Sequence, residues 1–418
     1  MKFFAGKKKT FDYKWVIASL CFFMMFVGLG FCSSTKNVYF QPITEAQNFS
    51  RSAFGISDTF RYATNSILTL FFYRQIEHFG IKILICVGLA SYALSALVNA
   101  VSNTLAGFYV GGIFLGIAVA FAGSTMVSII INKWFVNNKG TVLGIILSAN
   151  AAGSATAIVL LEPMIYSGGF GYRNAYFVTA VAVVVVLVIV AIFYKDKAGY
   201  AISNNTEKKR QGNLEWEGFQ YETLIRKPTF YAVIICLVTY SLLSVSNIAT
   251  PHFKDVGFSG EFIALVSCIG SIGLAVSKIL VGVIYDHFGI KTSVNICLFA
   301  ALAAKFLLFF VTVETPSLAI AYTVIMSIAT PLETVMLPII ILDLFGQRSF
   351  NKALAITTSL FTVGQALNAP LLNIPYDFTN DYTISFITAT VASVVILIIC
   401  NFSMMSLKRD AKKESLMR

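Results

Sequence analysis

The chain has 418 residues, of which 57% are hydrophobic and only 12% are charged. Soluble globular domains carry about 25% charged residues, so the composition argues against a water-soluble body of this size. The formal net charge of +11 is high enough to raise nucleic acid as a partner. However, the basic residues lie between long apolar stretches, which favours an integral membrane protein that binds no nucleic acid.

Long stretches without Asp, Glu, Lys or Arg are the direct evidence for membrane-spanning helices. Residues 83–132 contain no charged side chain, and this length holds two spans of about 20 residues each. Further uncharged runs cover residues 140–161, 174–194, 228–253, 353–376 and 382–407. The sequence therefore predicts an all-α membrane protein with about twelve transmembrane helices.

The predicted spans follow one another with short polar connections. The first six lie at about 15–41, 53–75, 83–102, 105–132, 140–166 and 172–194, and the last six at about 228–250, 261–284, 292–313, 317–343, 353–376 and 382–406. With the N-terminus in the cytoplasm, 24 of the 31 Lys and Arg residues fall on cytoplasmic segments and 4 on outer segments. Basic loops stay in the cytoplasm, so we expect a multi-pass plasma-membrane protein with both termini cytoplasmic.

A short motif occurs once in each half of the chain. Residues 77–82 read EHFGIK after the second span, and residues 286–291 read DHFGIK after the eighth, 209 residues later. Repeated six-span halves are a known transporter design. We therefore predict a first six-helix half at 1–194, a cytoplasmic linker at 195–227, and a second six-helix half with a short cytoplasmic tail at 228–418.

The repeated motif resembles the G-x-x-x-D-R-x-G-R-R loop of the major facilitator superfamily, which follows the second span and is echoed after the eighth. Gly282 and Asp286 match the second copy, whereas Tyr73 and Glu77 replace the Gly and Asp of the first. The resemblance covers nearly the whole chain and implies the major facilitator fold in two halves. It also implies cytoplasmic gate loops at Glu77, Gly80, Asp286 and Gly289.

Within that superfamily the chain resembles the monocarboxylate porters and the oxalate/formate exchangers. Three features carry this resemblance. The pair Trp134-Phe135 is followed by NKG at residues 138–140, and the first span ends in YFQP at residues 39–42. The third feature is Lys278, four residues before Gly282. It implies a secondary transporter of a small organic anion, a monocarboxylate, that works by alternating access with proton symport or anion exchange. The expected partners are this solute, a proton or counter-anion, and the lipid bilayer. We expect a monomer that is not an enzyme.

Two lysines inside predicted spans are candidate substrate ligands, because ionisable groups in a membrane are costly and mark functional sites. Lys36 lies in the outer half of the first span, where some monocarboxylate porters have an important lysine; the alternative is that it extends to the outer headgroups. Lys278 lies about 12 Å along the helix from Asp286. The resemblance implies that it binds the substrate carboxylate, and it is also a candidate for proton coupling. The alternative for Lys278 is a structural ion pair.

The third ionisable candidate is Glu333, which lies in the tenth span between Pro331 and Pro338. Each proline removes a helix hydrogen bond, and transporter sites are often built where helices are broken near the membrane midplane. We predict that Glu333 binds substrate or carries the coupled proton.

The resembling families do not generally have an acid here. A second hypothesis is therefore an amino-acid transporter, in which Lys278 binds the carboxylate and Glu333 the ammonium group. A third is a solute sensor without flux.

The remaining candidates are polar residues on spans that we expect to line the centre. They are predicted substrate contacts, although such groups also bond between helices: Tyr39, Ser124, Asn150 and Gln365. Lys305 in the ninth span is expected to extend to the headgroups, and Arg61 to lie at the outer start of the second span.

No motif indicates a metal, a cofactor or ATP. The seven cysteines lie in or beside apolar spans without a CxxC pair, and the three histidines lack the spacing of metal ligands. The sequence contains no P-loop. We therefore expect no metal and no cofactor.

Overall fold

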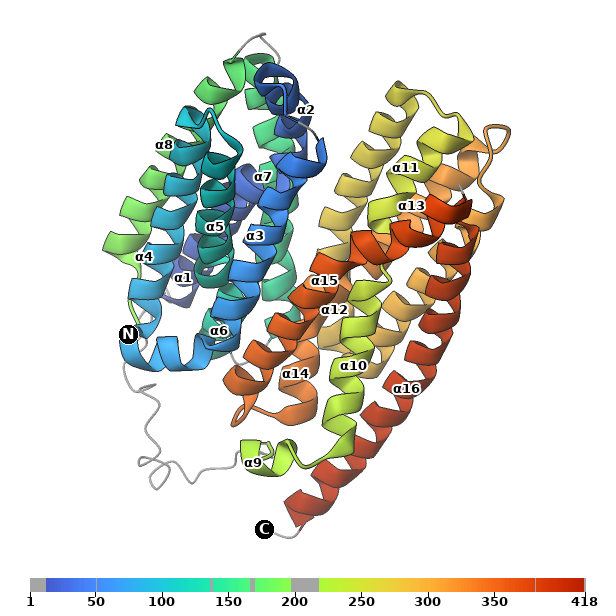
Figure 1. Cartoon of the computed structure of the whole chain (residues 1–418). Coiled ribbons are helices and arrows are strands. Elements are labelled where there is room, and N and C mark those ends of the chain that lie inside the picture. The colour runs from blue at the N-terminus through green and yellow to red at the C-terminus, as the bar shows by residue number, and fades with distance from the viewer. Residues whose placement is uncertain are drawn as a thin grey trace, which may run out of the picture.

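The computed structural model describes residues 13–49, 51–135, 138–165, 170–196, 218–379 and 381–416. Within these ranges the chain is helical and contains no strand. The helices form two bundles, shown in blue to green and in yellow to red in Figure 1. The start of α1 and the end of α16 lie at the same end of the molecule, which we call the terminus side; the other end is the opposite side.

The first bundle is built from six runs of helix. The first run has a π-helical centre, η1, and the fourth is divided at Gly123. The elements are α1 (Lys14–Phe23), η1 (Met24–Ser34) and α2 (Lys36–Gln47), then α3 (Arg51–Leu70), α4 (Phe72–Val101), α5 (Leu105–Ala122) with α6 (Ser124–Trp134), α7 (Lys139–Ile165) and α8 (Gly171–Phe193).

The second bundle follows a short helix, α9, on the terminus side. Its tenth predicted span has a π-helical centre, η3, which includes Glu333. The elements are α9 (Tyr221–Leu224), α10 (Pro228–Leu242) with α11 (Ser246–Val256), α12 (Gly260–Leu307) with the 3₁₀ turn η2 (Leu308–Phe310), α13 (Pro316–Ala329) with η3 (Leu332–Met336) and α14 (Leu337–Phe345), α15 (Phe350–Thr379) and α16 (Thr383–Leu416).

Eight stretches of described helix are long and apolar enough to cross a membrane, and one of them, Leu265–Phe310, covers both the eighth and the ninth predicted spans. The seventh predicted span is not among the eight because its apolar helix, Pro228–Leu242, is shorter. The second and eleventh predicted spans, α3 and α15, are not among the eight either. Both are rich in polar residues, and they pack against each other through reciprocal hydrogen bonds between Ser66 and Ser359. Their polarity therefore reflects a position inside the protein. The predicted second span also ends too late: α3 stops at Leu70 and α4 begins at Phe72.

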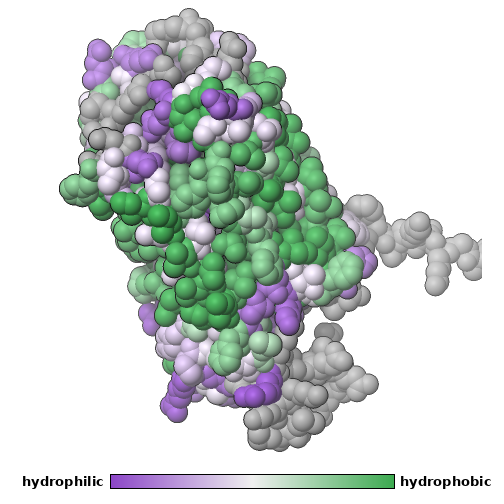
Figure 2. Space-filling model, turned by 90° about the vertical axis from the view of Figure 1, so that its right-hand side faces the viewer, coloured by the Kyte–Doolittle hydropathy of each residue, from purple (hydrophilic) through white to green (hydrophobic). Residues whose placement is uncertain are grey.

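The outer surface of the second bundle has the pattern expected of a membrane protein. Figure 2 shows a broad band of hydrophobic residues between hydrophilic patches at the two ends of the molecule. Exposed apolar side chains such as Val391, Ile398 and Phe402 of α16 contribute to this surface. A band of this kind matches the hydrocarbon core of a bilayer, which is about 30 Å thick.

The two bundles are joined by close contacts towards the terminus side. The Asp286 carboxylate accepts hydrogen bonds from the backbone N–H of Gly140 (3.1 Å) and from the N–H and hydroxyl of Thr141 (2.7 and 2.6 Å). Gly140 and Gly282 pack directly against each other. A Cβ atom added to Gly140 would lie 2.6 Å from the Gly282 carbonyl oxygen, and one added to Gly282 would lie 2.3 Å from the Gly140 carbonyl oxygen. Nearby, the Asn132 amide donates to Gln347 at 3.0 Å.

The end of the predicted linker is folded against the second bundle. Phe219 and Leu224 are fully buried. The Phe219 N–H donates to the Phe345 carbonyl at 3.1 Å, and the Ser349 hydroxyl donates to the Phe219 carbonyl at 3.2 Å. Burial of these two apolar side chains stabilises the packing of a mostly polar stretch against the second bundle. Residues 197–217 lie outside the described part of the chain.

Candidate functional site

A cavity of about 270 Å³ lies between the two bundles, and both contribute to its wall. Its lining is mostly hydroxyl and amide side chains with a few aliphatic groups. Transporter sites occupy this place, at the interface of two repeats near the middle of the helices. Four of the predicted substrate contacts line the cavity: Ser124, Asn150, Glu333 and Gln365.

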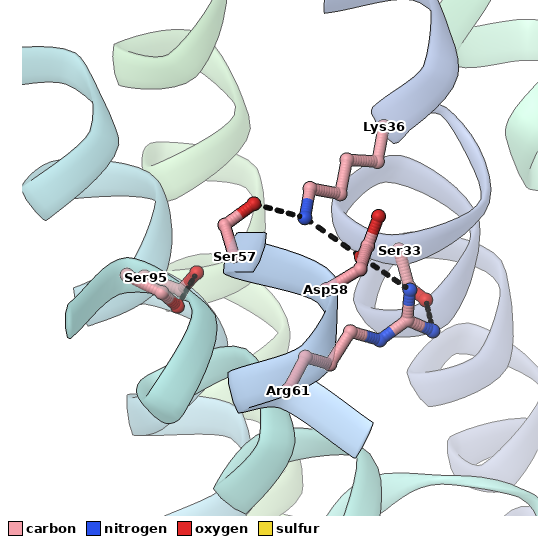
Figure 3. A network of polar contacts seen from close by, with 7 residues as sticks. Ser33, Lys36, Ser57, Asp58, Arg61 and Ser95 are labelled. Atoms are coloured by element: carbon pink, nitrogen blue, oxygen red, sulfur yellow. Dashed lines mark hydrogen bonds and ion pairs between the residues drawn. The ribbon is translucent and has the colours of Figure 1, made fainter. Parts of the chain in front are cut away.

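Arg61 also lines the cavity, which corrects the expectation that it lies at the outer start of its span. It is in the middle of α3, and its guanidinium donates a 2.6 Å hydrogen bond to the Ser33 hydroxyl. A second guanidinium nitrogen lies 3.6 Å from the Asp58 carboxylate, three residues earlier on the helix (Figure 3). The difference arises because α3 begins at Arg51, so that Arg61 lies ten residues inside the helix. The Asp58–Arg61 spacing, which places both on one helix face, was the available signal.

Lys36 belongs to the same polar network (Figure 3). Its ammonium group donates to the Asp58 carboxylate at 2.7 Å and to the Ser57 hydroxyl at 2.9 Å. The side chain is 12% exposed, so it points to Asp58 within the protein. One carboxylate is thus shared by two cations, Lys36 and Arg61, and the network carries one excess positive charge.

Tyr39 packs away from the cavity wall, in the core of the first bundle. It is 2% exposed, and its ring stacks on Tyr176 with the ring centroids 4.2 Å apart. This position gives Tyr39 a packing role, while its predicted contact with substrate stays a prediction.

Lys278 is buried behind the cavity wall and crosses from one bundle to the other. It lies on α12 of the second bundle and is 2% exposed. Its ammonium group donates to the Asn150 side-chain oxygen at 2.8 Å and to the Leu147 carbonyl at 3.2 Å, both on α7 of the first bundle. Asn150 therefore stands between Lys278 and the cavity, and direct contact of Lys278 with substrate stays a prediction.

Glu333 faces the cavity from η3, the π-helical break between Pro331 and Pro338. Its carboxyl group lies near the side chains of Ser244 and Gln365 and within electrostatic range of Lys305 and Lys278. π-Helical segments are frequent at functional sites. Here the break turns a carboxyl group towards the interface of the two bundles.

Lys305 is buried, which corrects the expectation that it extends to the headgroups. It is 1% exposed, and its ammonium group donates to the Ser393 hydroxyl at 2.7 Å and to the Ala389 carbonyl at 3.4 Å on α16. It also lies 5.6 Å from the centre of the Tyr240 ring. A helix at the edge of a bundle still has one face turned inwards, and the number of the span does not show which face carries the lysine.

The sequence profile of the Major Facilitator Superfamily matches residues 17–254 and 230–416. The chain belongs to the Major Facilitator Superfamily. Its fold is accordingly the all-α facilitator fold, and its general activity is secondary transport across a membrane.

Two curated proteins from Bacillus subtilis (strain 168) are similar to this chain. The uncharacterized MFS-type transporter YcxA is 22% identical over 285 residues, which is 67% of each chain. Multidrug resistance protein 2 is 24% identical over 232 residues, which is 54% of this chain and 56% of that protein.

Solved facilitator structures share the fold over most of the length. The proton:xylose symporter XylE, bound to 6-bromo-6-deoxy-D-glucose, has a TM-score of 0.71 at 15% identity, covering 93% of this chain and 94% of that one. The Escherichia coli fucose:proton symporter FucP has a TM-score of 0.69 at 14% identity, covering 94% of this chain and 99% of that one. At these identities the likeness concerns the fold alone.

The two facilitator signature loops have the same backbone geometry but different contacts. Gly80 and Gly289 both break their helices with φ of +76°, a conformation that glycine adopts at little cost. Asp286 reaches α7 of the other bundle, as described above. Glu77 is exposed, and its carboxyl group lies near the Tyr73 hydroxyl of the same helix.

Among the described residues, no group of three or more His, Cys, Asp or Glu side chains is placed to hold a metal ion. All seven cysteines are free thiols. The chemistry that this arrangement offers is recognition of a solute by charge and hydrogen bonds.

Proposed function

We propose that this facilitator transports a small organic anion, a monocarboxylate, by alternating access with proton symport or anion exchange. The supporting observation is a set of connected ionisable groups in which basic groups outnumber acidic groups by two. Arg61 and Glu333 line the cavity. Lys36 and Arg61 share the Asp58 carboxylate, and Lys278 and Lys305 lie within electrostatic range of Glu333.

An excess of buried positive charge is costly in an apolar medium, and a bound anion reduces that cost. Arg61 is the best placed of the four cations, because it lines the cavity itself. Its planar guanidinium matches the geometry of a carboxylate. The volume of about 270 Å³ is below the usual range for drug-sized ligands, which favours a small solute.

The arrangement of the bundles fits one state of an alternating-access cycle. Contacts from Asp286, Gly282 and Gln347 to the first bundle close the terminus side. If the termini are cytoplasmic, as the loop charges predict, this state is closed to the cytoplasm. Separation of these contacts would then open the cavity to that side.

The second candidate substrate is an amino acid. It is favoured by one observation, that Arg61 and Glu333 line the same cavity from opposite bundles. A zwitterion would place its carboxylate at the basic groups and its ammonium group at Glu333. In that case Glu333 is a substrate ligand instead of a carrier of the coupled proton.

The test is uptake into proteoliposomes that contain the purified protein. The panel contains labelled lactate, pyruvate, formate, oxalate and neutral amino acids, with and without an inward proton gradient and with and without unlabelled solute inside. Uptake of a monocarboxylate that either condition stimulates supports the proposal. Uptake of amino acids alone transfers the assignment to a zwitterion, and absence of uptake across the panel contradicts it.

Arg61→Gln tests the site within the same assay. We expect the ratio of maximal rate to half-saturating concentration to fall by about 100-fold, because a charge-assisted carboxylate contact is worth about 1.5–3 kcal/mol and the guanidinium also orients the solute. Arg74→Gln is the matched control, since Arg74 is exposed at the start of α4. Equal loss in both variants, or full activity of Arg61→Gln, would refute the role of Arg61.

A further inference from the structure

Lys278 is the feature from which a further inference can be drawn, because it connects the two bundles and the cavity at once. Its two hydrogen bonds go to Asn150 and Leu147, which belong to the opposite bundle. Asn150 in turn lines the cavity. Since the Asn150 oxygen is already bonded to Lys278, the amide N–H groups are what this side chain offers to a solute.

The helices that carry these residues are packed at very short range. A Cβ atom added to Gly144 of α7 would lie 2.5 Å from the backbone oxygen of Lys278 on α12. Gly140 and Gly282 make the same kind of backbone contact further towards the terminus side. Opening that side must separate α7 from α12, and this separation removes both acceptors from the Lys278 ammonium group.

A buried ammonium group that loses its acceptors needs another partner, because an unpaired charge in the membrane interior is strongly unfavourable. Glu333 is the available carboxylate. It lies on the same bundle as Lys278, so it stays near when the bundles separate, and the two groups are already within electrostatic range. The two states of the transporter would thus offer Lys278 two different partners.

We propose that Lys278 is a conformational switch: it bonds to Asn150 and Leu147 across the interface while the terminus side is closed, and moves to Glu333 when α7 and α12 separate. In this role Lys278 also positions Asn150, which lines the cavity. This exchange of partners depends on the separation of α7 from α12 and not on which solute is carried.

The reporter for the open state is a single cysteine at position 359. Ser359 is 4% exposed and is hydrogen-bonded to Ser66 of the other bundle, so a thiol there reacts with a water-soluble maleimide only after the bundles separate. The experiment uses the full chain in detergent with its seven native cysteines replaced and Ser359→Cys added. The rate of alkylation then measures the open population without any solute, which keeps this test independent of the proposed substrate.

We expect Lys278→Met to raise the alkylation rate by roughly tenfold or more, the effect of losing hydrogen bonds from a charged donor. Glu333→Gln should lower the rate by about threefold or more, because the open state then lacks its carboxylate. Opposite directions in the two variants are the signature of the switch. Lys278→Arg should return the rate towards that of the parent protein.

Lys291→Met is the matched control, because Lys291 lies on the same helix α12 but is exposed. Its alkylation rate should stay within about twofold of the parent. An unchanged rate in Lys278→Met, or a change in the same direction in Glu333→Gln, would overturn the proposal. If Lys278→Met does not fold, Asn150→Leu removes the same contact from the other bundle and should also raise the rate.

Discussion

The two signature loops of this facilitator start from nearly the same sequence and end in different contacts. Asp286 places its carboxylate at the N-terminus of α7, where the unpaired backbone N–H groups and the helix dipole favour an anion. Glu77 stays on its own helix with Tyr73. On that side the bundles meet through Lys352 of α15, whose ammonium group lies 4.8 Å from the centre of the Tyr73 ring and 5.3 Å from that of Tyr221.

This difference shows that a repeated sequence fixes the backbone of a loop but not its partner. The partner of Asp286 is α7, which has Gly140 in its first turn, and this glycine allows α7 to approach Gly282 closely. Residues 138–140 read NKG and residues 351–353 read NKA. The corresponding position in the other half is therefore Ala353, which is fully buried. A side chain at this position changes the approach of the helices, and the molecule therefore has one carboxylate latch and one cation–π contact.

The largest expected effect in this comparison comes from Asp286→Asn. The variant keeps the shape of the side chain but loses the charge that accepts three hydrogen bonds from Gly140 and Thr141. Charged hydrogen bonds contribute about 1.5–3 kcal/mol, so the alkylation rate of a cysteine at position 359 should rise roughly tenfold to hundredfold. A rise below twofold would show that Asp286 does not hold the terminus side closed.

Lys352→Met should have an intermediate effect. It removes a cation from the two rings of Tyr73 and Tyr221, while the methionine still covers part of their surface. Cation–π contacts at exposed sites contribute about 0.5–1 kcal/mol, which predicts a twofold to fivefold faster alkylation in the same assay. An effect equal to that of Asp286→Asn would mean that the Lys352 contact and the Asp286 contact stabilise the closed state equally. The proposed difference between the two loops would then be wrong.

The smallest effect is expected for Glu77→Gln, which also serves as the control for Asp286→Asn. Glu77 is exposed, and exposed pairs of this kind contribute about 0–1 kcal/mol. Alkylation at position 359 should therefore stay within twofold of the parent protein. A rise of tenfold or more would show that the first loop also latches the interface, as the sequence repeat alone predicted.

The sequence was informative where the membrane imposes a rule on every residue. Uncharged stretches located most spans, the repeated motif located the two loops, and the ionisable and polar residues on inner spans included Glu333 and Asn150 of the cavity wall. Predictions from the sequence were wrong for Arg61 and Lys305, because the burial of these side chains depends on which face of the helix turns inwards. They also missed the docking of Phe219, because two apolar side chains in a polar stretch produce no periodic pattern.

The polarity of α3 and α15 has a consequence for how this protein is made. At the centre of a helix leaving the translocon, Asp or Arg costs about 2.5–3.5 kcal/mol per residue, and α3 carries both Asp58 and Arg61. Such a helix does not enter lipid favourably by itself. We therefore expect α3 to be stabilised in the membrane only after α5 has followed it, because Gly112 and Gly116 of α5 lie against the backbone of Ser57 and Arg61.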